Sequence, residues 1–489
     1  MSAGTAATDP QGSLRVNAVR GTAVTLSTQF VFFLINVIVS VTLARLLTPE
    51  AFGVFGIAFA LTGFFEFAKN GGLLMPMIQR PSISAEQIST LFWINVGLGF
   101  VLFVGALVMA PLAAYVYTDT RLVAVISALA CTFIVAGFST QHLAVLRRQM
   151  RFSTIAWCEF SALIVASALA IVMARRGATY WALVGFHLGR EVTYALLVSG
   201  VSGWWPSWHQ RTTPVRPLLR SGILMMLFEL LGYLNFKADN LVVGWALGPV
   251  ALGFYSKAYE FCLQPINQVT QPMSGVLHSA LSRSQADSHR YSMLLVRALF
   301  VTTALGLPAT AFLFANADTI IVQLLGEPWR AAASIARALA PAAACVSITS
   351  CVGWIFLSLD RGRRQLPWSL VTTVVTIVAF SIGTLRGAVG VATAFSVTRV
   401  LLLIPTLAYT CHGTSIRWQT LVRTVAQPAI ASATALLAIL WLSIANAAES
   451  LPGLALHALV FCAVYVGVLL LMPQGRAFAR DHAPNALWR

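Results

Sequence analysis

Residues 47–53 read Leu-Thr-Pro-Glu-Ala-Phe-Gly, and residues 247–253 read Leu-Gly-Pro-Val-Ala-Leu-Gly. Both stretches lie in the short connection after a long apolar segment, which indicates that the chain contains two copies of one unit. Six expected membrane spans separate the copies, and an even number places both units the same way up. We therefore expect a repeat axis along the membrane normal and a substrate path between the halves, as in transporters built from parallel repeats.

Composition places the chain in a membrane. Of its 489 residues, 58% are hydrophobic and only 10% are charged, whereas a soluble domain has apolar and charged shares of about half and about a quarter. Apolar runs of about 20 residues, the length that a helix needs to cross a bilayer, recur along the chain. Fourteen spans are expected, at about 21–44, 51–68, 87–112, 122–146, 153–174, 179–199, 221–244, 250–275, 292–315, 332–358, 366–384, 388–409, 425–446 and 452–472.

The repeat and the spans together predict the architecture. The fold class is an all-α polytopic membrane protein with about 14 transmembrane helices. Two pseudo-symmetric six-helix lobes are expected over residues 15–205 and 215–412, and two accessory helices over 425–472. Similar places in the sixth and twelfth spans hold Phe186-x-x-x-Arg190 and Phe395-x-x-x-Arg399, which supports the repeat.

The net charge of +16 is explained by membrane topology. If the N-terminus is cytoplasmic and the loops alternate, twenty of the 32 Lys and Arg residues fall on the cytoplasmic side, six fall on the other side and six lie within spans. This bias is the positive-inside signature and predicts that both termini are cytoplasmic. It also accounts for the basic charge without a nucleic-acid partner.

Sequence signals for catalysis are missing. The expected outer connections are short, the longest being about 316–331, and they carry few carboxylates, which argues against a membrane glycan polymerase. We find no phosphate-binding glycine loop, ATPase signature, Ser-His-Asp group or metal-ligand spacing, and the seven cysteines are scattered. The sequence therefore predicts no catalytic residue, no metal and no cofactor.

Polar side chains concentrate in the eighth span. They recur at steps of three and four, so they share one face of a helix; they are Lys257, Glu260, Gln264, Asn267, Gln268 and Gln271. Such groups are costly in a bilayer and normally face a partner or an aqueous cavity. We favour a cavity lining over interhelical packing, although Lys257 and Glu260 are one turn apart and can pair with each other.

Two further spans add polar faces. The seventh carries Glu229, Tyr233, Lys237 and Asn240 at helical spacing, with Asp239 on another side, and the first carries Thr22, Thr25, Gln29, Asn36 and Ser40. Lysine and arginine suit an anionic diphosphate, and amides suit sugar hydroxyls. Lys237, Lys257, Arg190 and Arg399 are the candidate cations, with an ion pair involving Glu191 and a neighbouring helix as the alternative role of Arg190.

Several motifs resemble one transporter family. Leu146-Arg147-Arg148-Gln149-Met150-Arg151-Phe152, followed by Glu159, is similar to the inner-loop motif of the Wzx flippases, the polysaccharide-transporter branch of the MATE/oligosaccharide-flippase superfamily. A longer match, also similar to that family, consists of Asp239, Gly244, Gly248, Leu252-Gly253, Tyr255, Ala258, Pro265 and Ala280-Leu281-Ser282-Arg283, with Leu325-Gly326-Glu327-x-Trp329 further on. His278 and Trp245 depart from the family pattern and leave the subfamily open.

The resemblance implies a function. It implies a V-shaped pair of six-helix bundles with a central cavity between the first, second, seventh and eighth helices. It further implies alternating access that carries an undecaprenyl-diphosphate-linked oligosaccharide across the bacterial inner membrane, for exopolysaccharide, capsule or O-antigen, alongside a glycan polymerase and glycosyltransferases. Two alternatives stay open: a MATE-like exporter of small molecules or cations, which would be expected to carry a carboxylate in its first helix, and an integral membrane glycan polymerase.

Overall fold

A computed structural model describes residues 31–71, 84–207, 216–445 and 450–476, and these form a set of long helices. In chain order they are the helix Val31–Leu46, α2 (Pro49–Gly71), α4 (Ala85–Val116), α5 (Arg121–Arg148), α6 (Phe152–Arg175), α7 (Trp181–Val201), α8 (Arg216–Arg283), α9 (Ser288–Leu325), α10 (Arg330–Ser358), α11 (Gly362–Gly383), α12 (Gly387–Cys411), α13 (Trp418–Ala445) and α14 (Leu451–Leu471). Short 3-10 turns, η1 (Glu327–Trp329) and η2 (Thr384–Arg386), precede α10 and α12.

The predicted all-helical membrane fold is confirmed. Within the described ranges, nine helical stretches are long and apolar enough to cross a membrane, and one of them, Gly362–Cys411, contains two of the predicted spans. Each predicted span overlaps a helix, so the helices are compatible with fourteen spans. Helix α8 is divided at Gly248, whose φ of 80° is open to glycine but strained for other residues. This kink separates the predicted seventh and eighth spans.

One connection differs from the prediction. The longest of the short outer connections is expected over about 316–331, but α9 continues to Leu325, so only Gly326 and η1 remain before α10. Asn316 leaves the helical conformation, with φ −114° and ψ 22°, and marks a kink inside α9. The kink is packed rather than open, because Asn316 Oδ1 forms a 2.8 Å hydrogen bond with Nδ1 of the buried His457 in α14.

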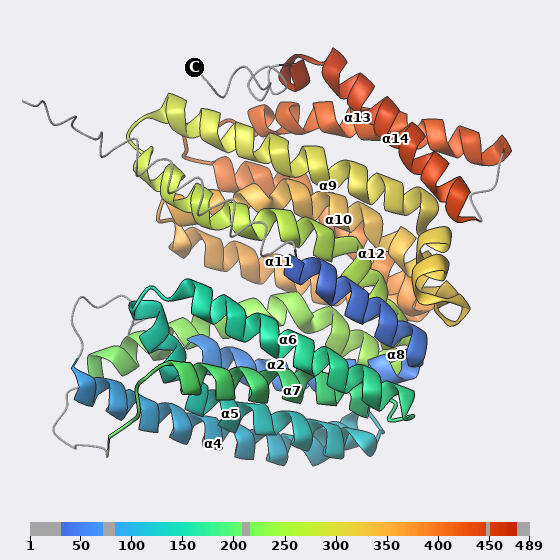
Figure 1. The fold of residues 1–489 in the computed structure, drawn as a ribbon. Helices are drawn as coiled ribbons and strands as arrows, with labels where there is room; N and C mark the ends of the chain where they lie inside the picture. The colour runs from blue at the N-terminus through green and yellow to red at the C-terminus, as the bar shows by residue number, and fades with distance from the viewer. Residues whose placement is uncertain (1–30, 72–83, 208–215, 446–449, 477–489) are drawn as a thin grey trace, which may run out of the picture.

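Figure 1 shows the helices in two groups, with α8 between them. In the first bundle α4 packs on α5, α6 on α7, and α5 on both α2 and α7. In the second bundle α10 packs on α9 and α12, and α11 on α12, while α13 and α14 lie at the edge against α9. The bundles meet where α2 packs against α8, and this junction forms the candidate site.

Candidate functional site

The two copies of the repeat touch each other. A Cβ placed on Gly53 would lie 1.7 Å from the carbonyl oxygen of Pro249, and one on Gly253 would lie 1.9 Å from the carbonyl oxygen of Pro49. Each copy therefore contributes the same glycine and the same proline to a reciprocal contact, which we call the Pro49–Pro249 crossing (residues 47–53 and 247–253). Only glycine permits this approach, because any side chain would overlap backbone atoms.

A tryptophan from the second bundle completes the contact at this end. The Trp329 ring is fully buried, and its Nε1 donates a 2.8 Å hydrogen bond to the carbonyl oxygen of Ala44. Its ring also meets Phe52 of α2 edge-on, with 5.3 Å between centroids, and Phe254 of α8 at 6.0 Å. Such edge-to-face pairs stabilise packing beyond simple area burial. Trp329 thus ties the helix Val31–Leu46 and α2 to the second bundle.

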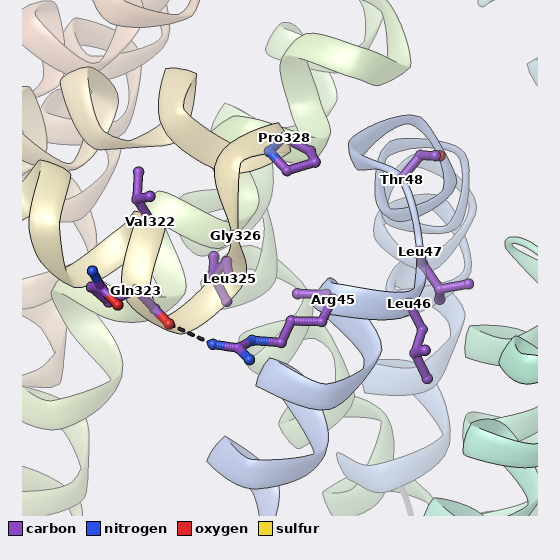
Figure 2. Close-up of a pocket in the computed structure, with 10 residues that line it drawn as sticks. Arg45, Leu46, Leu47, Thr48, Val322, Gln323, Leu325, Gly326 and Pro328 are labelled. Atoms are coloured by element: carbon purple, nitrogen blue, oxygen red, sulfur yellow. Dashed lines mark hydrogen bonds between the residues drawn. The ribbon is translucent and has the colours of Figure 1, made fainter.

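Arg45 makes a second tie at the same end. Its Nε donates a 2.8 Å hydrogen bond to the carbonyl oxygen of Leu324, and its Nη2 donates to that of Gln323. These are the last carbonyl groups of α9, which a cation stabilises through the helix dipole. Figure 2 shows Arg45 reaching toward Gln323 across a pocket of about 480 Å³, with Thr48 and Pro328 on its wall.

Charged residues of α8 meet the first bundle deeper along the junction. Lys257 is buried, and its Nζ lies 2.8 Å from Glu260 Oε2, as the spacing predicted. Ser40 joins both partners: its Oγ accepts from Lys257 Nζ at 2.6 Å and donates to Glu260 Oε1 at 2.7 Å. The ammonium also lies over the Phe52 ring, 4.4 Å from its centroid, a cation–π contact. We call Ser40, Lys257 and Glu260 the cross-bundle triad.

The amides of the eighth span continue the same helix away from the crossing. Gln264, Gln268 and Gln271 are exposed and Asn267 is half-buried. No hydrogen bond joins any of these four side chains to another residue in the part of the chain that the structure describes. We call these four residues the amide row.

A family model described as "Polysaccharide biosynthesis protein" matches residues 42–334, which include the crossing, Lys257 and Glu260 of the triad, the amide row and Trp329, and begin two residues after Ser40. The chain belongs to this family. The resemblance to Wzx-type transporters that the motifs indicate is confirmed, because the family match is joined by similar proteins named for lipopolysaccharide biosynthesis and for succinoglycan biosynthesis transport.

Two such relatives of this polysaccharide biosynthesis family show its range. The chain is 24% identical to the lipopolysaccharide biosynthesis protein WzxC of Escherichia coli (strain K12) over 396 residues, which covers 80% of each chain. It is 25% identical to the succinoglycan biosynthesis transport protein ExoT of Rhizobium meliloti (strain 1021), over 71% of this chain and 70% of the relative.

Solved structures support the fold of this family member. The chain is similar to the lipid II flippase MurJ in an inward closed conformation, with a TM-score of 0.74 and 15% sequence identity. The match covers 95% of this chain and 100% of that one. At this identity the likeness establishes a shared polytopic helical fold.

Three more predicted residues of α8, namely Lys237, Asn240 and Asp239, differ in their burial and contacts. Lys237 and Asn240 are half-buried, and Lys237 is near enough to Asp239 and Glu260 to interact with them electrostatically. Asp239 is buried, and its carboxylate accepts from the Asn240 backbone N–H at 2.7 Å and from the Tyr255 hydroxyl at 3.2 Å. Asp239 is thus satisfied inside the second bundle.

Arg190 and Arg399, which hold similar places in the sixth and twelfth spans, have different surroundings. Arg190 is half-buried in α7, where it interacts electrostatically with Glu159 of α6. The ion-pair alternative foreseen for Arg190 therefore has a partner on a neighbouring helix. Arg399 lies over the Phe395 ring, 4.9 Å from its centroid, and its buried Nε has no hydrogen-bond partner among the described residues. Arg399 is within electrostatic range of Asp239 and Tyr259.

Three predicted residues cannot be placed. Gln29 lies outside the described residues, and the side chains of Glu229 and Tyr233 lie outside them as well. Asn36 is on the same helix as Ser40, but its Nδ2 donates to the carbonyl oxygen of Phe32 in its own helix at 2.8 Å. In this conformation Asn36 therefore makes an intrahelical contact.

Sequence reasoning missed several residues of the junction. Trp329, Phe52 and Arg45 were not predicted to join the bundles, although Trp329 belongs to a motif that was noticed. One signal pointed to the crossing: glycine ends both copies of the repeat, at 53 and 253. A glycine kept at the same place in two otherwise different copies is typical of close backbone approach.

Proposed function

We propose that this protein is a flippase that moves a lipid-linked oligosaccharide repeat unit across a bacterial inner membrane by alternating access. The proposal is supported by family membership and by relatives named for lipopolysaccharide and succinoglycan biosynthesis. The observation that carries it is the amide row, because its side chains are exposed and unbonded on a helix that also holds a buried cation.

The amide row suits a glycan better than a packing seam. Amides that hold membrane helices together do so through hydrogen bonds between helices, and the amide row makes none with the described residues. Amides that are free to donate and accept can instead bind sugar hydroxyls. We therefore place the glycan along Gln264, Asn267, Gln268 and Gln271, with Lys237, Lys257 and Arg399 as candidate partners for the diphosphate.

The positive-inside bias gives the proposal its direction. The Pro49–Pro249 crossing lies on the side poor in Lys and Arg, which faces the periplasm under this rule. Both termini then lie in the cytoplasm. The hydrogen bonds of Arg45 and Trp329 hold the two bundles together at the periplasmic end, so the described conformation is one in which that end is closed. The six-helix units 15–205 and 215–412 would be the bodies that move.

The proposal assigns transport without catalysis. In this role the protein would receive its substrate from glycosyltransferases on the cytoplasmic face and deliver it to a glycan polymerase on the other. Cell fractionation tests the function: a strain lacking the protein should retain single lipid-linked repeat units on the inner leaflet. A strain lacking a polymerase would instead export them unpolymerised, so export of single units by the deletion strain would contradict the proposal.

A further inference from the structure

We propose that Ser40 positions Lys257 and Glu260 across the bundle junction and keeps the Pro49 end closed until an anionic head group binds the Lys257 ammonium group. This inference rests on the proposed function for the nature of the anion, but the contact itself does not. Ser40 belongs to the helix Val31–Leu46 of the first unit, whereas Lys257 and Glu260 belong to α8 of the second. The cross-bundle triad therefore spans the two bodies that must separate.

The triad is a closed ring of three hydrogen bonds. Ser40 Oγ accepts from Lys257 at 2.6 Å and donates to Glu260 at 2.7 Å, and Lys257 donates to the other oxygen of Glu260 at 2.8 Å. A hydroxyl can fill this place because it donates one hydrogen bond and accepts others at the same atom. Removing Ser40 would break two of the three bonds, both of them between the bundles.

The cross-bundle triad also engages the ammonium group of Lys257 in hydrogen bonds. Two of its donors go to Ser40 and Glu260, and the group lies against the face of Phe52, 4.4 Å from the ring centroid. With 4% of its surface exposed, Lys257 has no open side for another anion. Ser40 and Phe52 both come from the first unit, so separation of the bundles would leave the lysine with Glu260 alone.

This arrangement makes anion binding and closure mutually exclusive. A ligand shifts a conformational equilibrium only by its difference in affinity for the two states. A diphosphate can reach the Lys257 ammonium only after the ring has opened, so it binds the separated state better than the closed one. Binding to Lys257 would also displace Glu260, which is the acceptor for the Ser40 hydroxyl. The substrate head group would thus release the contact that keeps the end closed.

The test uses one introduced cysteine, in a variant without the native cysteines, to report opening of the Pro49 end. Ala51, which is 3% exposed at the crossing, is replaced by cysteine, and its reaction with a membrane-impermeant maleimide is timed in purified protein. Ser40→Ala should raise the labelling rate about five-fold or more, since it removes two hydrogen bonds to charged groups. Ser40→Thr should label as the parent does. Thr42→Val is the matched control, because among the described residues the Thr42 hydroxyl bonds only to the carbonyl oxygen of Ile38 in its own helix, at 2.8 Å.

Addition of farnesyl diphosphate tests the release step, with farnesol as the uncharged control. In the parent, farnesyl diphosphate should raise the labelling rate and farnesol should not, whereas in Ser40→Ala the diphosphate should add little. Glu260→Gln, which keeps the side-chain shape, should also label faster than the parent. Equal labelling of Ser40→Ala and the parent would overturn the inference, even if glycan export by the parent upheld the flippase. A labelling rate of the parent that farnesyl diphosphate leaves unchanged would overturn the release step.

Discussion

Trp329 and Ala44 are joined by a 2.8 Å hydrogen bond from the indole Nε1 to a backbone carbonyl oxygen, although they lie 285 residues apart in the sequence. The indole is completely buried against Phe52 and Phe254, so it fills the junction and bonds across it. An opening of this end that parts Trp329 from Ala44 and Phe52 must lose this bond and the ring contact with Phe52. The closed state is therefore specified by named contacts that substitution can weaken one at a time.

Replacing Trp329 by phenylalanine should loosen the closed end. The change keeps an aromatic ring but removes one hydrogen bond, worth about 1 kcal/mol, so the open population should rise about five-fold. Maleimide labelling of cysteine at position 51 measures this rise. Trp354→Phe is the control, because Trp354 Nε1 bonds to Ser274 Oγ within the second bundle at 2.9 Å. Equal acceleration by both variants would contradict the role given to Trp329.

Alanine at Gly53 or Gly253 should prevent normal closure. The added methyl group would lie 1.7 or 1.9 Å from a backbone carbonyl oxygen, so the crossing must spread. Such overpacking costs about 1–3 kcal/mol or more, and we expect export to fall about ten-fold in either variant at normal expression. Gly97→Ala serves as the control, since no atom of the described residues lies within 4 Å of a Cβ at that position. Parental export by both crossing variants would show that the contact is dispensable.

Leucine at Gln268 should reduce export without reducing stability. Gln268 is exposed and bonds to no described residue, so its loss should change the free energy of unfolding by no more than about 0.5 kcal/mol. If the amide binds glycan, transport falls while the melting temperature of the purified protein stays constant. A large drop in melting temperature would instead support the packing interpretation of the amide row.

Topology can be tested with single cysteines. Thr118 is exposed between α4 and α5, and Ala286 is exposed between α8 and α9. In intact cells, cysteine at Thr118 should react with an impermeant thiol reagent, and cysteine at Ala286 should react only after lysis. Asp119 is the next residue in the same connection. Burial opposes ionisation of the Asp119 carboxyl group, but hydrogen bonds from Arg121 outweigh this effect and lower the pKa of Asp119. The opposite labelling pattern would reverse the orientation that the positive-inside bias predicts.

Much of the fold could be predicted because hydropathy and helix length are local properties of the sequence. The pairing of Lys257 with Glu260 was foreseen for the same reason, since residues three apart on a helix are neighbours. Ser40 was placed on a polar face of its helix, but its contact with α8 depends on how two distant helices cross. No local sequence pattern encodes how these two helices pack against each other.

The repeat shows a similar limit. Two similar heptapeptides at 47–53 and 247–253 predicted two equivalent units, but not that the copies would touch each other. The contact is reciprocal, with Gly53 against Pro249 and Gly253 against Pro49, and it depends on how α2 and α8 pack together. The kink at Asn316 was missed because its partner, His457, comes from a helix outside the repeat.

A crosslink across the crossing tests alternating access most directly. Cysteines at Ala51 and Ala251, midway between the two glycine–proline contacts in each copy, should be bridged by oxidation or by bifunctional reagents of graded length. Cysteines at Glu50 and Arg121, whose side chains are paired at 2.8 Å within the first bundle, give the control crosslink. We predict that the Ala51–Ala251 crosslink stops glycan export, that its cleavage restores export, and that the control crosslink leaves export intact. Continued export with the Ala51–Ala251 pair fully crosslinked at short span would contradict alternating access and favour a fixed groove along which the lipid slides.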